Sequence, residues 1–217
     1  MIDSTNWNIQ IPGSGELQTV TYSLYYSSNC GKYLVVTSPS GVIVYISDVY
    51  PGHISDRDLA LYSFLYLGHD RGWLLAGDDV MADRGFNIKD ALFSIYCDLV
   101  IPPFKEKGKQ QFSHEQREVV ATVTHKRVHV ERSVGLLKKW DILHREAPRQ
   151  LWPSMTKVVR VCAWLANETC KPMVGSHDLE EMEKKLKELN LHPMSPSSSF
   201  PNRSGSQPSK KKTKLAT

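Results

Sequence analysis

The chain has 217 residues, 41% of them hydrophobic, which suits one domain with a sizeable core. No stretch approaches the roughly 18 to 20 apolar residues that cross a membrane, and the first residues lack the basic and apolar regions of a secretory signal. We therefore expect no membrane association. The four cysteines have no zinc-finger spacing, so reduced and mostly buried thiols are expected at Cys30, Cys97, Cys162 and Cys170.

The formal net charge of +4 is unevenly distributed along the chain. Residues 1–102 carry 5 Lys and Arg against 11 Asp and Glu, whereas residues 103–165 carry 13 against 6. An acidic half joined to a basic half is typical of concentrated carboxylates beside a surface that meets phosphates. Pairing of opposite charges across the surface would give the same asymmetry, so charge alone leaves both interpretations open.

The first hundred residues favour strands joined by turns. A first strand is expected within 1–11 and another over 20–26. Two apolar, β-branched runs at 33–37 and 42–47 flank a Ser-Pro-Ser-Gly turn, which predicts a hairpin.

A helix and two short strands follow the hairpin. Ser55 or Asp56 is expected to cap a helix over 57–67, because leucines and a phenylalanine there supply an apolar face. Short buried strands are predicted at 80–82 and 99–101.

The apolar period becomes helical from about Ser113. Valines recur at spacings of three, four and seven, which predicts one helix to about Trp140 with basic residues on its other faces. A further apolar helix is expected over 153–167. The order of strands, helix, strand and helices gives an α/β class, with helices packed on a mixed sheet.

The main domain of the chain is assigned to 1–170, followed by two smaller segments. Residues 171–192 are expected to contain an amphipathic helix. Residues 193–217 are rich in Pro, Ser and Gly and are expected to be disordered. The tail ends in a basic run at 210–214, which fits a nuclear import signal, a nucleic-acid contact or a solvated tail.

Three acidic residues stand out by their context. Asp3 lies at the start of the first expected strand, Asp83 follows the strand at 80–82, and Glu131 lies within a basic helix. Two aspartates at strand ends and one glutamate on a helix can converge at one edge of a sheet. Mg²⁺ and Mn²⁺ prefer such oxygen ligands, and two such ions can promote phosphodiester cleavage. This chemistry is compatible with the three residues but does not select them among 23 acidic ones.

Four segments carry a family resemblance. They read Ile-Asp-Ser-Thr at 2–5, Tyr-Ile-Ser-Asp-Val-Tyr-Pro-Gly-His-Ile-Ser-Asp at 45–56, Met-Ala-Asp-Arg-Gly-Phe at 81–86, and Val-His-Val-Glu-Arg-Ser-Val-Gly-Leu-Leu-Lys at 128–138. The segments occur in this order, and 47 residues separate Asp83 from Glu131. On these grounds, residues 1–165 resemble the DDE-type transposase domain of the PIF/Harbinger-like superfamily.

The resemblance implies a ribonuclease H-like fold and Mg²⁺-dependent (or Mn²⁺-dependent) hydrolysis at transposon ends, followed by attack of the freed 3′-hydroxyl on target DNA. The family's three catalytic acids, which are also its metal ligands, fall on Asp3, Asp83 and Glu131. DNA is the implied partner and the nucleus the expected location, with the cytoplasm as a second one. Whether the protein forms oligomers is left open.

Each proposed acid also has a structural interpretation. Asp3 could be a terminal or turn residue, Asp83 could cap the Arg-Gly-Phe turn, and Glu131 could pair with Arg127 one helical turn earlier. Asp56 is interpreted as a helix cap. The flanking residues Arg84, His129, Arg132 and Asp48 could steady the ligands, touch DNA or be solvated. The aromatic residues are scattered, and no stacking platform for single strands is predicted.

The sequence departs from the family at its start. Relatives carry a helix-turn-helix segment before the first catalytic Asp, whereas two residues precede Asp3 here. We therefore expect sequence-specific recognition to need a partner, such as a helix-turn-helix or Myb-like DNA-binding protein. Two hypotheses follow: a metal-dependent endonuclease of transposase type, and a domesticated, transposase-derived nuclear interaction protein without catalysis. A general nuclease on the same fold is a third option.

Overall fold

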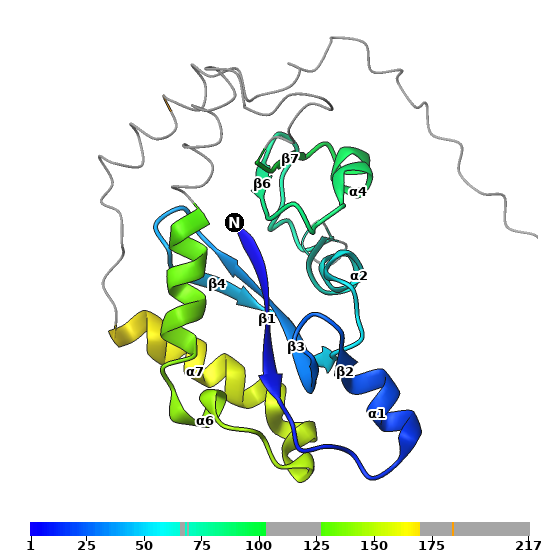
Figure 1. Ribbon diagram of the computed structural model, residues 1–217. Coiled ribbons are helices and arrows are strands. Elements are labelled where there is room, and N and C mark those ends of the chain that lie inside the picture. The colour runs from blue at the N-terminus through cyan, green and yellow to red at the C-terminus, as the bar shows by residue number, and fades with distance from the viewer. Residues whose placement is uncertain (66–67, 69, 103–126, 170–183, 185–217) are drawn as a thin grey trace, which may run out of the picture.

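An antiparallel sheet forms the centre of the computed structural model, which describes residues 1–65, 68, 70–102, 127–169 and 184 (Figure 1). Strand β1 (Ile2–Asn8) pairs with β3 (Ser28–Thr37), and β3 pairs with β4 (Ile43–Ile46). The strand expected within 1–11 and the hairpin are therefore confirmed. The two-residue strands β2 (Tyr22–Ser23) and β5 (Tyr50–Pro51) pair with the first half of β3.

The strand expected over 20–26 is wrong for most of its length. Helix α1 (Gly15–Thr21) forms instead, because the Ser14 hydroxyl accepts a hydrogen bond from the backbone N–H of Leu17 at 3.2 Å and caps the helix. Only Tyr22–Ser23 is extended, and residues 24–27 make the turn into β3. A local capping interaction thus overrides the β propensity of the aromatic and β-branched residues.

The sheet buries both of its faces, and alternation along the strands divides the core into two clusters. Leu34 and Val36 pack with Ile2 against the side that carries α2 (Asp56–Ala60), the π-helical turn η1 (Leu61–Leu65) and α4 (Lys89–Ser94). On the other face, Tyr33 and Val35 pack with Trp7 against the helices that follow residue 127. The arrangement is therefore helices on both faces of a sheet.

Two further strands form a separate parallel pair. Strands β6 (Asp79–Met81) and β7 (Asp98–Val100) match the two short strands expected from the sequence and are joined through α4. The α/β class is confirmed. The expected single mixed sheet is not what the described ladders show, because β6 pairs with β7 and no ladder links it to β1. The ribonuclease H-like topology therefore remains a prediction.

The helices of the second half follow the predicted order. A helix over 127–137 buries Val130 and Leu137, and α6 (Asp141–His144), the 3₁₀ turn η2 (Arg149–Ser154) and α7 (Met155–Thr169) follow it. The helix expected over 153–167 is confirmed as α7. The valines at 119, 120 and 123, Cys170, the amphipathic helix within 171–192 and the tail 193–217 lie outside the described residues.

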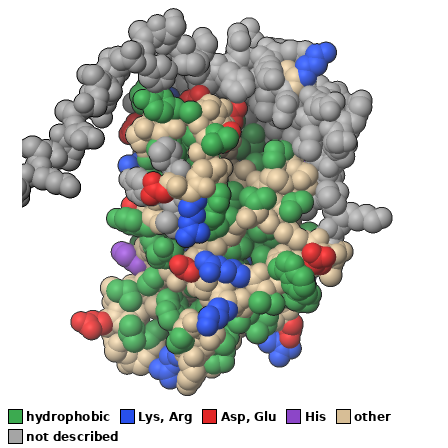
Figure 2. All heavy atoms as spheres, turned by 180° about the vertical axis from the view of Figure 1, so that it is seen from behind, with side chains coloured by type: hydrophobic (Ala, Val, Ile, Leu, Met, Phe, Trp, Pro, Cys, Tyr) green, Lys and Arg blue, Asp and Glu red, His purple; other side chains and the backbone are tan. Residues whose placement is uncertain are grey.

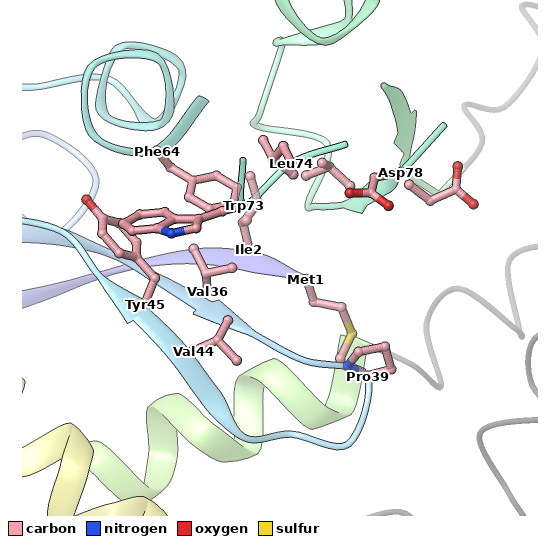
Figure 3. A pocket seen from close by; sticks show the side chains of 12 residues that line it. Met1, Ile2, Val36, Pro39, Val44, Tyr45, Phe64, Trp73, Leu74 and Asp78 are labelled. Carbon is pink, nitrogen blue, oxygen red and sulfur yellow. The ribbon is translucent and has the colours of Figure 1, made fainter. Parts of the chain in front are cut away.

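An apolar cavity of about 520 Å³ lies at the start of β1 (Figure 3). Ile2, Tyr45 and Trp73 form part of its lining, and the ring centroids of Tyr45 and Trp73 are 5.4 Å apart. Its wall also includes Val80 of β6.

Cys30, Cys97 and Cys162 are buried free thiols, as expected. Among the described residues, none of the helices has the length and apolar character to span a bilayer.

Candidate carboxylate centre

Strand alternation places Asp3 and Ser4 on opposite faces of β1. Asp3 shares its face with Trp7, which packs toward the helix at 127–137, whereas Ser4 shares its face with Ile2 and reaches α2. Burial raises the pKa of Asp3 to about 6. The Ser4 N–H, at 2.8 Å from Asp3 Oδ1, and the Arg127 guanidinium oppose this rise, while the carboxylates of Asp56 and Glu131 add to it. Asp3 is therefore within electrostatic reach of the helix that carries Glu131.

One guanidinium joins the other two predicted acids. Arg127 Nη1 lies 3.4 Å from Asp83 Oδ1, and Arg127 Nη2 lies 3.3 Å from Glu131 Oε1. Asp83 follows β6 and also accepts a hydrogen bond from the N–H of Arg84 at 2.7 Å. The helix contact between Glu131 and Arg127, considered from the sequence, is confirmed. The structure adds that the same arginine reaches Asp83, so the two acids converge on one cation.

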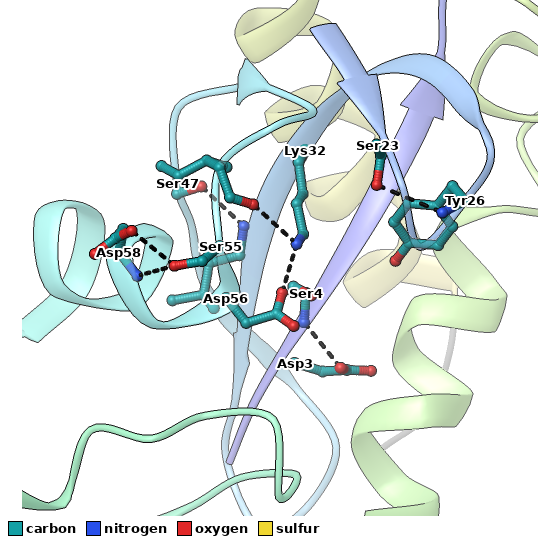
Figure 4. Close-up of polar contacts among 11 residues, drawn as sticks. Asp3, Ser4, Ser23, Tyr26, Lys32, Ser47, Ser55, Asp56 and Asp58 are labelled. Atoms are coloured by element: carbon teal, nitrogen blue, oxygen red, sulfur yellow. Dashed lines mark hydrogen bonds and ion pairs between the residues drawn. The ribbon is translucent and has the colours of Figure 1, made fainter. Parts of the chain in front are cut away.

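A fourth carboxylate lies beside this group. Asp56 Oδ1 accepts a hydrogen bond from Ser4 Oγ at 2.5 Å and lies 2.7 Å from Lys32 Nζ (Figure 4). The Lys32 ammonium is buried and also donates to the carbonyl oxygen of Ile54 at 3.2 Å. The interpretation of Asp56 as the helix cap is wrong, because the Ser55 hydroxyl accepts the capping bond from Asp58 N–H at 3.0 Å. Asp56 instead neutralises the buried Lys32, and its carboxylate contributes to the raised pKa of Asp3.

A second lysine approaches Asp3 from the helical side. Lys138 Nζ donates to Asn6 Oδ1 at 3.2 Å. Partial burial lowers the pKa of Lys138, and the nearby Asp3 carboxylate opposes this shift. The candidate centre therefore has cationic groups of Lys32, Arg127 and Lys138 around its carboxylates.

The flanking residues named from the sequence have other contacts. Arg84 Nε donates to the carbonyl oxygen of Pro102 at 3.2 Å, and His129 is buried. Asp48 pairs with Arg160 of α7 at 3.0 Å and does not join the centre. Arg132 is exposed. The face in Figure 2 mixes apolar, basic and acidic side chains, so its described part shows no broad basic surface.

The three predicted ligands are carboxylates from three separate segments of the chain. Their oxygens have the chemistry that Mg²⁺ and Mn²⁺ prefer, and a cation, the Arg127 guanidinium, already lies between Asp83 and Glu131. Within the described ranges, no three His, Cys, Asp or Glu side chains are already grouped as metal ligands. The oxygens of these residues therefore suit a divalent cation, and Arg127 would compete with such a cation for Asp83 Oδ1 and Glu131 Oε1.

The comparison with protein families identifies the family of this chain. The family described as DDE superfamily endonuclease matches residues 2–167, and these include all three predicted acids. The chain belongs to the DDE superfamily endonuclease family. No curated protein and no solved structure matches the chain. The family supports nuclease function in general, and the PIF/Harbinger-like subtype remains a prediction.

Sequence reasoning missed the contacts of Lys32, Ser4 and Asp56. Lys32 lies in a strand and Asp56 is 24 positions further along the chain, so no local spacing links them. The one available signal was Lys32 itself, a lysine directly before the apolar run of the hairpin. A charge in such a strand is buried only with a partner, which would have prompted a search for an acid.

Proposed function

We propose that this chain is a metal-dependent DNA endonuclease of transposase type, with Asp3, Asp83 and Glu131 as ligands of Mg²⁺ or Mn²⁺. The observation that carries the proposal is the convergence of Asp83 and Glu131 on Arg127 within electrostatic reach of Asp3, in a chain that belongs to the DDE superfamily endonuclease family. Three carboxylates from distant segments can supply the oxygen ligands that such metals prefer once Arg127 releases them.

A bound Mg²⁺ would supply Lewis acidity for phosphodiester hydrolysis. The residues of the chain do the rest. Asp3, held by the Ser4 N–H, presents a partly buried carboxylate whose negative charge is costly without a cation. Once Arg127 moves away from the carboxylates, its guanidinium is available for a DNA phosphate, which it can hold through two hydrogen bonds.

The finer assignments are proposals of the same kind. The four segments that resemble the PIF/Harbinger-like superfamily support a subtype in which DNA is the substrate and the nucleus the location. A helix-turn-helix or Myb-like partner protein would then supply sequence-specific recognition.

A non-catalytic interaction protein is the second candidate. It is favoured by the ion pairs of Arg127, because a side chain that neutralises two of the acids can also replace the metal permanently. The assay below distinguishes the two candidates.

Nicking of supercoiled plasmid in the presence of Mg²⁺ or Mn²⁺ tests the proposal. We expect nicking by the wild type and its loss in Asp83→Asn and Glu131→Gln. The matched control is Asp141→Asn, since Asp141 forms the same type of helical pair, at 2.8 Å from Arg145, away from the centre. Absence of nicking by the wild type, or equal nicking by all variants, would favour the interaction protein.

A further inference from the structure

The turn between β2 and β3 exposes two adjacent apolar side chains. Leu24 is 82% exposed and Tyr25 is 85% exposed. The ring of Tyr26 contacts the ring of Tyr25 edge to face, with centroids 4.8 Å apart. The backbone N–H of Tyr26 donates a hydrogen bond to the side-chain hydroxyl of Ser23 in β2 at 3.4 Å, which holds the turn against β2. Tyr25 is therefore braced on one side by Tyr26 and presents most of its surface to solvent.

This turn borders a hollow of about 320 Å³ that reaches the candidate centre. Leu24 and Tyr25 line it on one side, and Lys32, Asp56 and Gly85 line it elsewhere. Gly85 lies two residues after Asp83, and a Cβ added to it would lie 3.6 Å from Asp56 Oδ2. The hollow thus runs from the tyrosine turn to the segment that follows Asp83.

Tyr26 connects the turn to Asp3. Burial raises the pKa of the Tyr26 hydroxyl, and the carboxylates of Asp56 and Asp3 add to this rise. In Figure 4 the hydroxyl is directed toward the part of β1 that carries Asp3 and Ser4. A molecule that occupies the hollow and stacks on Tyr25 would lie near Asp56, which lines the same hollow.

The lining of the hollow has the composition of a nucleotide site. Aromatic rings stack on bases without selecting a sequence, and basic side chains attract the backbone phosphates. His53 and Arg57 line the hollow together with Lys32, whose charge is balanced by Asp56. The volume is at the lower end of the range for small-molecule pockets, which suits one nucleotide better than a duplex.

We propose that this hollow receives one unpaired nucleotide of the DNA strand that is cut, with its base stacked on Tyr25. The inference rests on the proposed function, because it takes DNA as the substrate. It adds that the preferred DNA has an unpaired or readily unpaired nucleotide beside the cleaved bond, whereas the phosphates of a fully paired duplex contact other surfaces.

Equilibrium binding without divalent metal tests the proposal. Fluorescence anisotropy compares a blunt duplex with the same duplex carrying a short single-stranded overhang, for the wild type, Tyr25→Ala and Tyr25→Phe. We expect Tyr25→Ala to weaken binding of the overhang DNA by about 5- to 150-fold, with little change for the blunt duplex. Tyr25→Phe keeps the ring and should bind like the wild type. Because Tyr25 is exposed, all variants should fold, which circular dichroism verifies.

The matched control is Tyr62→Ala, since Tyr62 is 63% exposed on η1 and does not line the hollow. Equal binding of overhang DNA by Tyr25→Ala and the wild type overturns the inference, as does an equal loss in Tyr62→Ala. If this occurs while the wild type still nicks plasmid, the proposed function stands and only the inference fails. If the wild type binds neither DNA, both fail together.

Discussion

Replacement of Arg127 by glutamine should tighten the binding of divalent metal. The Arg127 guanidinium pairs with Asp83 at 3.4 Å and with Glu131 at 3.3 Å, and both carboxylates are about half exposed. A metal ion that takes the same carboxylate oxygens, Asp83 Oδ1 and Glu131 Oε1, displaces Arg127 from both pairs. Arg127→Gln removes that cost in advance, so the difference in binding free energy equals the strength of the pairs.

The magnitude follows from ordinary ion pairs at exposed positions. Each contributes about 0.2 to 1 kcal/mol, so the two together contribute about 0.4 to 2 kcal/mol. This corresponds to a dissociation constant for Mn²⁺ that is about 2- to 30-fold lower in the variant. The gain should shrink at high salt, because exposed ion pairs are screened.

Isothermal titration calorimetry with Mn²⁺, supported by electron paramagnetic resonance of the free ion, measures this constant. The control Arg145→Gln removes a comparable helical pair with Asp141 and should leave Mn²⁺ affinity unchanged. Weaker or unchanged Mn²⁺ binding in Arg127→Gln would refute the reasoning, because it would mean that Arg127 holds the carboxylates in place for the metal.

Three further predictions concern stability, measured by denaturant unfolding of the metal-free protein. Burial raises the pKa of Asp3 in the folded protein from 3.8 to about 6, so the folded state binds the proton more tightly than the unfolded state. The ionised Asp3 therefore lowers the free energy of unfolding as the pH rises through that window. Asp3→Asn should gain up to about 3 kcal/mol over the wild type above pH 6 and nothing below pH 4. A gain independent of pH would contradict this assignment. Lys32→Met should cost about 2 to 4 kcal/mol, because it leaves Asp56 without its cation, and the double variant Lys32→Met with Asp56→Asn should recover part of the loss. Gly52→Ala should destabilise the fold by more than about 2 kcal/mol, roughly the scale of overpacking, since the added Cβ would lie 2.5 Å from a backbone oxygen. Its control, Gly135→Ala, adds a methyl group on the open side of a helix and should be neutral or stabilising. Equal effects of the two variants would show that the close approach at Gly52 is relieved by movement.

The parts of the fold that local patterns encode were predictable. The hairpin and α7 were expected because period-2 and period-3.6 apolar patterns and a turn signal occur within short windows. The strand expected over 20–26 failed because a single capping serine at position 14 decided the competition between helix and strand. The order of the strands was not predicted, because it depends on contacts between distant segments, and no local pattern at β6 reports whether β1 is its neighbour.

The contacts around the three predicted acids were only partly predictable from the sequence. Asp3, Asp83 and Glu131 were selected by resemblance to a family, and their catalytic role remains a prediction. The pair of Arg127 with Glu131 could be foreseen because helix geometry places residues four apart on one side. Its contact with Asp83 could not, since it depends on how the helix packs beside β6. The pairing of Lys32 with Asp56 is of the same non-local kind.

The pairing register of β1 with β3 has a consequence for how the candidate centre is assembled. Asp3 lies opposite Val35, and its face of the strand is the one that meets the helix at 127–137. Displacement of β1 by one residue would turn Asp3 to the face now occupied by Ser4 and bring a neutral side chain toward Glu131. A slipped strand could keep most of its backbone hydrogen bonds and still lose a carboxylate from the centre. The burial of Ile2 and Trp7 on opposite faces prevents this slip, so these two apolar side chains determine the chemistry of a site to which neither contributes a polar atom.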